Sequence, residues 1–477
     1  MSTARILILA RLFFRYFTRK ALSVGVLRCR LARTLLSLSA VAGVTLLSAV
    51  AASVFHDMIP GKRELFLVMQ VSTAGVVFWT FVVFIFVKIL FVKSDQLMRY
   101  TMLLPVSHRE RSAALTLYEF SMVALSVGVL FLPLAIACLT RLGAEAIPAM
   151  VTGIFMTAVS AYLVLSVLHN LVALALEAFG GSRLVHIVTL SLMAALTLWY
   201  NGASLTLIRD ITGDYLQGSV GFHLVNLFPF LSEQAGWPMA AAAFLTLSAV
   251  LTILAAFTSP RIFPLPRRFI RVPVPFAGRS LWPMVAALTR RSEWWIAVGV
   301  AYVCSILLWL EGDTAFAYSA LILLSQGVYV HSAASRLRLM PGYTRSAGKE
   351  VAYMLIGQAI VVAIHALPIS LLATVRPDAL DDLRTVGLAL LSGVILTTLI
   401  AIVFVAENDS PLVVFTGYAV CTGTLVSIGA MVGVLQVPGP WLWFAAACTQ
   451  VLAVVYSVAG MKQIMRWKRH EAAVPGS

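Results

Sequence analysis

The residues that could do chemistry in this chain are polar side chains set inside long apolar runs: Tyr118, Glu119, His169, Asn170, Gln358 and His365. An ionisable side chain at the centre of a bilayer costs about 2.5–3.5 kcal/mol on insertion scales, so each such residue needs a physical reason. One role is to line a substrate path, and the other is to pair or hydrogen-bond with a neighbouring helix. For Glu119 the second role predicts an ion pair with Arg99 or Arg111.

These side chains do not form a catalytic constellation. The histidines lack the i, i+4 partners of a zinc motif, the GxSxG pattern does not occur, and no single segment holds paired carboxylates. The cysteines have no metal-ligand spacing and most lie in apolar runs, so we expect buried thiols: Cys29, Cys138, Cys304, Cys421 and Cys448. The sequence therefore predicts no catalytic site, no metal site and no enzymatic domain.

The composition predicts that most of the surface faces lipid. Of 477 residues, 60% are hydrophobic and only 12% are charged, which is too little charge to cover a water-soluble chain of this size. The 35 Lys and Arg exceed the 20 Asp and Glu. Loops that face anionic headgroups explain this excess better than nucleic acid does, so we expect a multi-pass protein of the plasma membrane and no nucleic-acid partner.

The apolar runs predict an all-α polytopic fold with about twelve transmembrane helices, because a span needs roughly 20 apolar residues. The predicted spans are 34–55, 65–91, 113–139, 147–174, 184–207, 237–258, 293–310, 314–334, 350–374, 383–405, 411–434 and 440–462. In the loop between the fifth and sixth spans, the apolar stretch 222–230 predicts an interfacial or re-entrant helix.

The distribution of basic residues predicts that both termini are cytoplasmic. With that orientation, 29 of the 35 Lys and Arg fall on cytoplasmic segments, as the positive-inside rule requires. The outer loops hold only Lys62, Arg63, Arg141, Arg209, Arg376 and Arg384.

Two prolines at nearly matched places in each half suggest an internal repeat of six spans. Pro133 follows Pro105 by 28 residues, and Pro368 follows Pro341 by 27. Repeats of this kind place a substrate path at their interface. The predicted organisation is an amphipathic elbow region (1–33), a first repeat (34–259), a cytoplasmic linker with a second elbow (260–292), a second repeat (293–465) and a cytoplasmic tail (466–477).

The N-terminal segment predicts an amphipathic helix that lies in the headgroup plane. Arg11, Arg15 and Arg19 recur at i, i+4 and i+8, which places them on one stripe, and apolar residues fill the rest. This helix is either a simple topology anchor or an elbow that also touches a cytoplasmic partner.

The segment 94–111 is the most informative part of the chain. Pro105 followed by Ser107 predicts the end of one short helix and the cap of the next, with Glu110 at the third position of a capping box. Apolar residues on a short helix outside the bilayer require a protein partner to cover them.

The pattern Asp95-x-Leu97 followed by Leu104-Pro105-Val106-Ser107-x-x-Glu110-Arg111 resembles the coupling-helix region of ABC-2-type exporter permeases, in the long form with two fused six-span repeats. The resemblance covers 94–119 and is weaker over 332–354, where Met340-Pro341-Gly342-Tyr343-Thr344 departs from the Leu-Pro-Val-Ser form. The remainder matches in topology only.

The resemblance implies that two ABC ATPase subunits per chain dock on these loops and bind the ATP and magnesium. The docking residues it implies are Asp95, Leu97, Leu104, Pro105, Val106, Ser107, Arg109, Glu110, Arg111, Met340, Pro341, Arg345 and Lys349. No GxxxxGK[ST] phosphate loop occurs in the chain, so the ATPase must be a separate subunit.

We therefore expect the permease subunit of an exporter that moves an amphipathic substrate such as a peptide, lipid or drug. The alternative from another class is a twelve-span secondary transporter driven by an ion gradient. Such a carrier is expected to place more charge within its spans. A membrane-embedded enzyme is the third reading, and the missing constellation argues against it.

Overall fold

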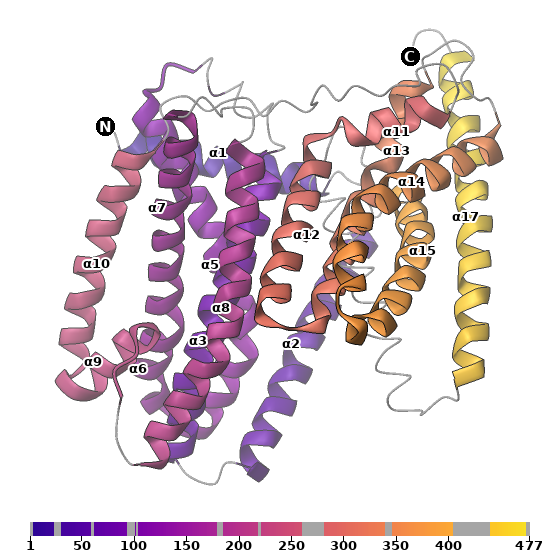
Figure 1. Ribbon diagram of the computed structural model, residues 1–477. Coiled ribbons are helices and arrows are strands. Elements are labelled where there is room, and N and C mark those ends of the chain that lie inside the picture. The colour runs from indigo at the N-terminus through magenta and orange to yellow at the C-terminus, as the bar shows by residue number, and fades with distance from the viewer. Residues whose placement is uncertain are drawn as a thin grey trace. The chain divides into compact units, whose positions relative to one another are not determined.

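The described part of the chain is entirely helical. The computed structural model describes residues 3–22, 30–58, 62–92, 101, 104–178, 185–217, 221–259, 281–338, 346–403 and 439–473. The chain divides into two compact units, Met1–Pro266 and Arg267–Ser477, whose elements are labelled in Figure 1.

The first unit is a bundle of long helices with short helical pieces between them. Its long helices are α1 (Thr3–Leu22), α2 (Arg30–Met58), α3 (Lys62–Val92), α5 (His108–Leu142), α7 (Thr157–Ala178), α8 (Val185–Leu216) and α10 (Trp237–Thr258). The short pieces are η2 (Gly143–Glu145), α6 (Ala146–Met150), η3 (Val151–Met156), η4 (Leu224–Asn226) and α9 (Leu227–Ala235).

Helix α3 lies at the centre of this unit and packs against α5, α7 and α8. Their shared core includes Phe84, Val123, Tyr162 and Met193. Helices α1 and α2 pack on α5, and α10 packs on α7 and α9. The helix predicted at 222–230 is present as η4 and α9, where buried Phe228 meets Phe244 edge to face.

A π-helical turn, η3, joins α6 to α7. A π-turn holds one residue more than an α-turn, since its hydrogen bonds run from i to i+5. The Thr157 hydroxyl donates to the carbonyl of Thr152, five residues earlier, at 3.0 Å. Gly153 lies at this turn against α3, where an added Cβ would be in ordinary van der Waals contact with Thr73 and with the Met69 carbonyl.

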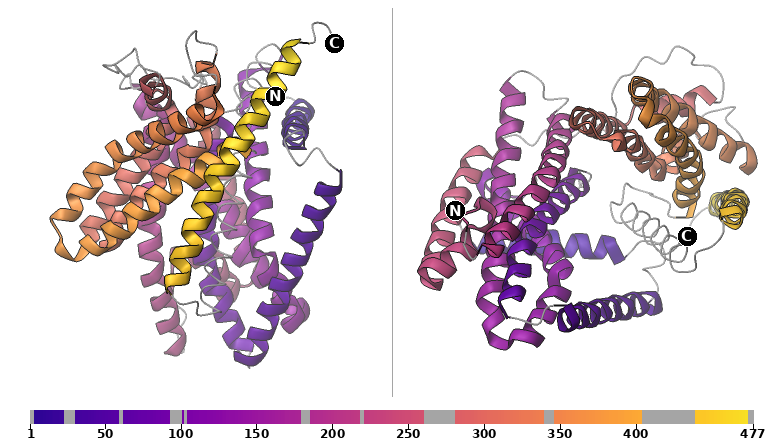
Figure 2. Two further views of the ribbon diagram at one scale, coloured as in Figure 1. Left: turned by 90° about the vertical axis from the view of Figure 1, so that its right-hand side faces the viewer. Right: turned by 60° about the horizontal axis from the view of Figure 1, so that its bottom comes forward.

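The second unit contains α11 (Leu281–Thr289), α12 (Ser292–Glu311), η5 (Thr314–Tyr329), α13 (Val330–Leu337), α14 (Ala347–Thr374), η6 (Pro377–Ala379), α15 (Leu380–Val403) and α17 (Gly439–Ala473). Figure 2 shows α17, in yellow, as one long helix. The core of this unit uses many alanines, among them Ala301, Ala320 and Ala334. Small residues allow close helix contacts inside a membrane, where lipid gives little hydrophobic driving force for association.

The element η5 is an unusually long 3-10 helix of 16 residues. At about 2.0 Å per residue it extends for about 32 Å, which is enough to cross the hydrocarbon core. Its buried residues Phe316 and Ser319, and Ala317, Ala320 and Leu323, lie three positions apart, as expected for a helix with three residues per turn, and Gly327, Val328 and Tyr329 are buried as well. The span predicted at 314–334 is therefore helical, but most of it is not α-helix.

Eight helical segments of the described chain are long and apolar enough to cross a membrane: Leu67–Lys88, His108–Arg141, Gly143–Ala178, Ile187–Leu216, Trp237–Thr258, Ser292–Glu311, Ala347–Thr374 and Leu380–Val403. Each matches one of the predicted spans. The spans predicted at 34–55 and 440–462 are helical as parts of α2 and α17, although neither belongs to these eight. The span predicted at 411–434 lies outside the described residues.

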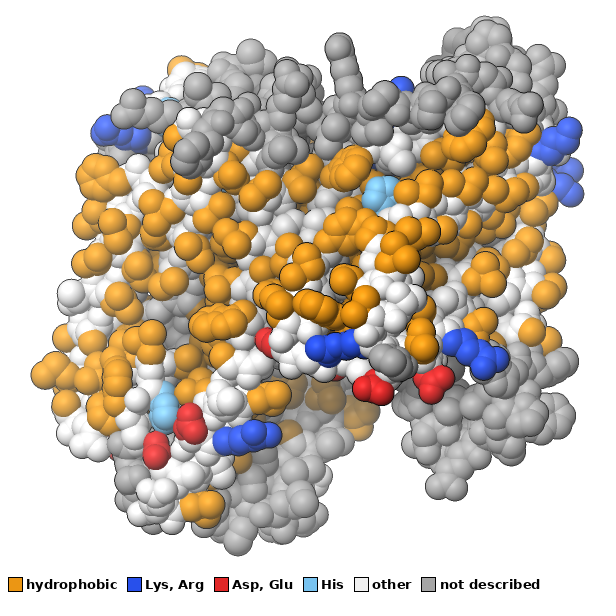
Figure 3. Space-filling model, in the orientation of Figure 1, with side chains coloured by type: hydrophobic (Ala, Val, Ile, Leu, Met, Phe, Trp, Pro, Cys, Tyr) orange, Lys and Arg blue, Asp and Glu red, His pale blue; other side chains and the backbone are white. Residues whose placement is uncertain are grey.

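The surface of the described helices agrees with lipid exposure. In Figure 3, hydrophobic side chains cover the sides of the helices, and the coloured charged side chains lie toward their ends. On α10, Leu245, Ile253 and Phe257 are exposed. Length, composition and surface together define a polytopic, all-helical membrane protein.

Candidate functional site

The turn before α5 is held by the capping box that the sequence predicts. The Glu110 backbone N–H donates to the Ser107 hydroxyl at 3.3 Å, and the Ser107 backbone N–H donates to the Glu110 carboxylate at 3.1 Å. Because the Glu110 side chain is buried in this arrangement while Leu104, Pro105, Ser107 and Arg109 are exposed, the turn presents a fixed, partly apolar surface.

Arg111 holds the other side of this turn. Its guanidinium Nη2 donates to the carbonyl oxygen of Thr101 at 3.1 Å. The Val106 N–H donates to the Leu104 carbonyl at 2.8 Å, which tightens the chain at Pro105. The segment that enters α5 is therefore held by both side-chain and backbone contacts.

Helix α1 packs on α5 immediately behind this turn. Leu9 and Phe13 are buried against Ala114 and Tyr118. Three rings of α1 surround the Tyr118 ring, with centroid distances of 5.9, 5.5 and 6.4 Å for Phe13, Phe14 and Phe17. Such aromatic pairs are each worth about 0.5–1.5 kcal/mol beyond their buried area, so they fix α1 on α5.

The helix predicted for the N-terminal segment is confirmed, and its arginine stripe faces outward. Arg11, Arg15 and Arg19 are all exposed, on the side opposite buried Phe13. Since an α-helix turns by 100° per residue, the i, i+4 spacing keeps the three guanidinium groups on one face.

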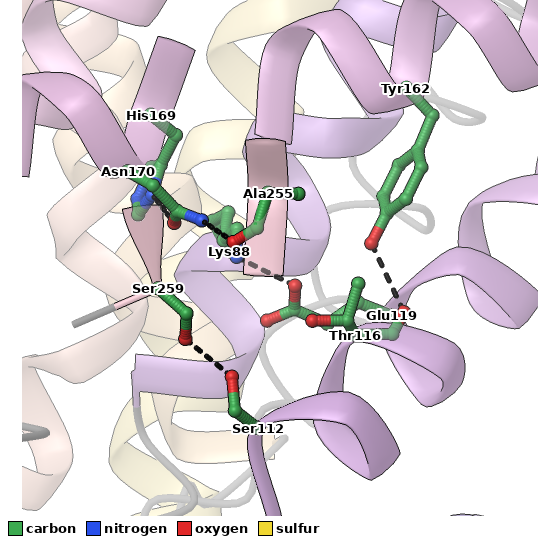
Figure 4. A network of polar contacts seen from close by, with 9 residues as sticks. All are labelled: Lys88, Ser112, Thr116, Glu119, Tyr162, His169, Asn170, Ala255 and Ser259. Atoms are coloured by element: carbon green, nitrogen blue, oxygen red, sulfur yellow. Dashed lines mark hydrogen bonds and ion pairs between the residues drawn. The ribbon is translucent and has the colours of Figure 1, made fainter. Parts of the chain in front are cut away.

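An ion pair is buried between α3 and α5, and its carboxylate belongs to Glu119, the residue that follows Tyr118. The Lys88 Nζ is 2.6 Å from the Glu119 carboxylate, and the two side chains are 14% and 5% exposed (Figure 4). The Lys88 ammonium also lies 5.4 Å from the centre of the Phe84 ring, within range of a cation–π interaction. A carboxylate buried this deeply requires a cation, and Lys88 supplies it.

The predicted ion pair between Glu119 and Arg111 was wrong, because Glu119 pairs with Lys88. We expected Arg99 or Arg111, but Arg111 donates to Thr101 and Arg99 lies outside the described residues. The reason is geometric: α3 continues as a helix to Val92, so Lys88 lies inside the helix, one turn after buried Phe84. The sequence analysis counted Lys88 among the cytoplasmic charges at the end of the predicted span 65–91 and did not consider it as a partner of Glu119, although its i+4 spacing from Phe84 was a usable signal.

His169 and Asn170 of α7 lie in the same region of the first unit. Figure 4 shows them beside Lys88 and Glu119, with the Asn170 amide donating to the carbonyl of Ala255 in α10 at 3.4 Å. The His169 ring meets Phe84 edge to face at 6.0 Å. The structure thus brings together three of the four path candidates of the first half, Glu119, His169 and Asn170, whereas the Tyr118 ring packs on α1.

Two further contacts tie the neighbouring helices to this network. The Tyr162 hydroxyl donates to the carbonyl of Thr116 at 3.1 Å, and the hydroxyls of Ser112 and Ser259 are hydrogen-bonded to each other (Figure 4). The sequence analysis did not identify Tyr162, Ser112 or Ser259. Single hydroxyl groups are common in membrane helices, and their partners are known only once the helices are packed.

Gln358 in the second unit joins α14 to α15 within their apolar spans. Its amide Nε2 donates to the Thr397 hydroxyl at 2.9 Å, and its Oε1 accepts from Thr398 at 3.0 Å. All three side chains are buried. Gly327 of η5 lies directly against this cluster, because a Cβ there would meet both Thr397 and Gln358. These contacts give Gln358 a structural role.

His365, two turns further along α14, contacts α12. Its Nδ1 lies 2.8 Å from the Val361 carbonyl, and the Trp294 indole Nε1 lies 3.5 Å from its Nε2. Nδ1 therefore carries the proton and Nε2 accepts, which describes a neutral imidazole. The rings of Trp294 and Trp295 stand edge-on to it at 5.2 and 5.6 Å.

The second unit also buries an ion pair beside the loop that contains Pro341. Arg338 follows α13 and pairs with Glu350 of α14, whose side chain is fully buried. The same guanidinium lies 3.3 Å from the Nδ1 of buried His331. In each unit, then, a cation and a carboxylate join the two helices on either side of the proline loop. Sequence reasoning counted Arg338 as a loop charge and missed this pair.

Several predicted docking residues lie outside the described part of the chain: Asp95, Leu97, Met340, Pro341 and Arg345. Lys349 is described and lies exposed in the first turn of α14. Among the described residues, no three His, Cys, Asp or Glu side chains gather closely enough to hold a metal ion. Cys138 and Cys304 are buried as expected, whereas Cys448 is exposed.

Comparisons with models of protein families, with curated proteins and with solved structures give no match for this chain. Its class is therefore defined by its own features, and it is a polytopic membrane protein with buried polar contacts inside its spans.

Proposed function

We propose that this chain is the permease subunit of an ATP-driven exporter of the ABC-2 type. In this proposal it lies in the plasma membrane and forms the path for an amphipathic substrate such as a peptide, lipid or drug. The observation that carries the proposal is the turn Leu104–Arg111, which is fixed by its capping box and exposes Leu104, Pro105 and Arg109 to a partner.

The position of this turn supports a role in transmitting force. The turn leads into α5. This helix packs against α1 through Tyr118 and is joined to α3 by the Lys88–Glu119 ion pair. A partner that pushes on the turn would therefore move α5 together with the helices it holds. A loosely attached loop would absorb the same displacement.

The order of elements in the two units supports a duplicated permease. In the first unit the first helix, α1, packs on α5, which contains Pro133, and in the second unit the first helix, α11, packs on α14, which contains Pro368. The last long helix of each unit, α10 or α17, packs on the helix that follows the proline helix. We infer two six-span repeats with both termini cytoplasmic and a path at their interface.

The partners follow from this assignment. Two ABC ATPase subunits, one for each proline loop, would bind the ATP and magnesium, and this chain would have no ATPase activity of its own. Of the path candidates in the first unit, Glu119, His169 and Asn170 lie close together (Figure 4), and Tyr118 is the residue before Glu119 in α5.

The docking surface can be tested by co-purification with the candidate ATPase. The substitution Arg109→Glu reverses an exposed charge on the turn and leaves the capping residues Ser107 and Glu110 intact. We expect it to abolish recovery of the ATPase subunit. The matched control is Arg209→Glu, since Arg209 is also exposed but lies near the far end of α8.

Unchanged recovery with Arg109→Glu would count against docking at this turn. The stoichiometry tests the duplication separately: one chain with two ATPase subunits is expected, and two chains with two subunits would overturn the fused-repeat reading.

A secondary transporter is the second candidate, and the buried ion pairs favour it. Charged residues inside spans often mark ion-coupled carriers. Lys88 and Glu119 form such a pair, and Glu350, near the start of the span Ala347–Thr374, is paired with Arg338. Transport by the purified chain in vesicles, driven by an ion gradient without an ATPase, would establish this alternative and overturn the exporter proposal.

A further inference from the structure

The outward face of α1 combines positive charge with exposed apolar side chains. Arg5, Arg11, Arg15 and Arg19 are exposed, and so are Leu7, Ile8 and Leu12 at 60%, 66% and 44%. The opposite face is fully used by its contacts with α5. This face therefore has room for a partner while the helix stays docked.

The segment that contains this face carries charge of one sign. The chain contains no Asp or Glu before Asp57, whereas its first 33 residues contain eight Lys and Arg. Within α1 no carboxylate can neutralise the arginines through i, i+4 pairs. The complementary partner must carry negative charge.

The exposed apolar residues decide which negative partner fits. Arginine heads with neighbouring leucine and isoleucine side chains match a lipid surface, where guanidinium groups reach phosphates and apolar groups enter the acyl boundary. An acidic groove on a protein would satisfy the charge but would need an apolar strip for Leu7, Ile8 and Leu12 as well.

We propose that the outward face of α1 is a binding surface for anionic phospholipid headgroups, and that lipid charge thereby sets the position of α1 on α5. Binding moves α1 toward the headgroups. Because Phe13, Phe14 and Phe17 pack on the Tyr118 ring, a shift of α1 displaces Tyr118, the residue before Glu119 in α5. The lipid composition of the membrane then acts on the helix that contains the buried ion pair. This inference does not depend on an ATPase partner.

The test uses the full chain in nanodiscs of phosphatidylcholine alone or with added phosphatidylglycerol. A single cysteine replaces Ile8 in a background without accessible cysteines, and its reaction rate with a water-soluble maleimide reports exposure. Each basic residue near an anionic surface contributes roughly a fivefold preference, so three arginines contribute on the order of a hundredfold. We expect phosphatidylglycerol to slow the reaction strongly.

The triple substitution of Arg11, Arg15 and Arg19 by Gln should remove this protection, and the same triple substitution by Lys should keep most of it. The matched control replaces the exposed arginines Arg141, Arg209 and Arg384 by Gln, which removes equal charge elsewhere and should leave the protection intact. Equal reaction rates in both nanodiscs, or protection unaffected by the Gln triple, would overturn the proposal. Protection that arises only when an ATPase subunit is added would assign the face to a protein instead.

Discussion

Lys88 and Glu119 meet across the two helices that the Pro105 turn connects, with the Lys88 Nζ 2.6 Å from the carboxylate. The ion pair joins α3 to α5, the helices before and after the turn, so both ends of the connecting segment are attached to packed helices. Arg338 and Glu350 occupy the corresponding place beside the second proline loop. The two pairs differ in spacing, 31 residues apart in one case and 12 in the other, yet each joins the helices on either side of its loop.

Removal of one partner of this pair should be costly. Lys88→Met leaves the buried Glu119 carboxylate without a cation, and breaking a buried pair in this way costs about 3–5 kcal/mol. We expect a clearly lower unfolding temperature for the purified full chain in detergent. The double variant Lys88→Met with Glu119→Leu should recover most of the loss, because it buries no charge. A double variant as unstable as the single one would show that the pair is not the cause.

The capping box should stabilise the first turn of α5. Ser107→Ala removes the side-chain acceptor for the Glu110 N–H and should cost about 1 kcal/mol. Hydrogen exchange at the backbone N–H groups of the first turn of α5 should accelerate accordingly. Ser107→Thr keeps the acceptor and serves as the control. Equal acceleration in both variants would mean that the cap hydrogen bond contributes nothing there.

The close contact at Gly327 should tolerate no added methyl group. A Cβ there would collide with Thr397 Oγ1 and Gln358 Nε2, which are hydrogen-bonded to each other. Overpacking of this kind costs about 1–3 kcal/mol, and the change in unfolding temperature measures it. The control is Gly387→Ala in α15, where a Cβ meets open space. There the helical preference of alanine should stabilise the chain by about 0.5–1 kcal/mol.

The docking of α1 on α5 should depend on its buried aromatic residues. Phe13 is fully buried against α5, whereas Leu7 on the same helix is 60% exposed. Phe13→Ala should release α1 and speed tryptic cleavage after Arg11, Arg15 and Arg19, since it removes a ring that packs on Tyr118. Leu7→Ala should leave the cleavage rate unchanged. Similar rates for both variants would mean that the helix is held by something else.

The features predicted well from the sequence are those that depend on neighbouring residues. The capping box at Ser107 follows from residues three apart, and the long helices follow from the length of apolar runs, as for α5 and α14. Such patterns can be recognised in the sequence without knowledge of how the helices pack. The amphipathic helix α1 was predictable for the same reason, because Arg11, Arg15 and Arg19 share one periodicity.

The features that sequence reasoning missed depend on how helices rotate and pack. The pairing of Glu119 with Lys88 was missed because Lys88 belongs to a different helix, and nothing local to Glu119 identifies it. The 3-10 geometry of η5 was missed because hydropathy is the same for both kinds of helix.

The π-turn at Val151–Met156 has a consequence for which length changes this bundle tolerates. Deleting one residue there would convert the wide turn to an ordinary α-turn and leave the faces of α6 and α7 in phase. The same deletion inside α8 would rotate everything after it by about 100°. Homologous chains one residue shorter at this point would therefore keep Tyr162 and Asn170 directed at the same neighbours.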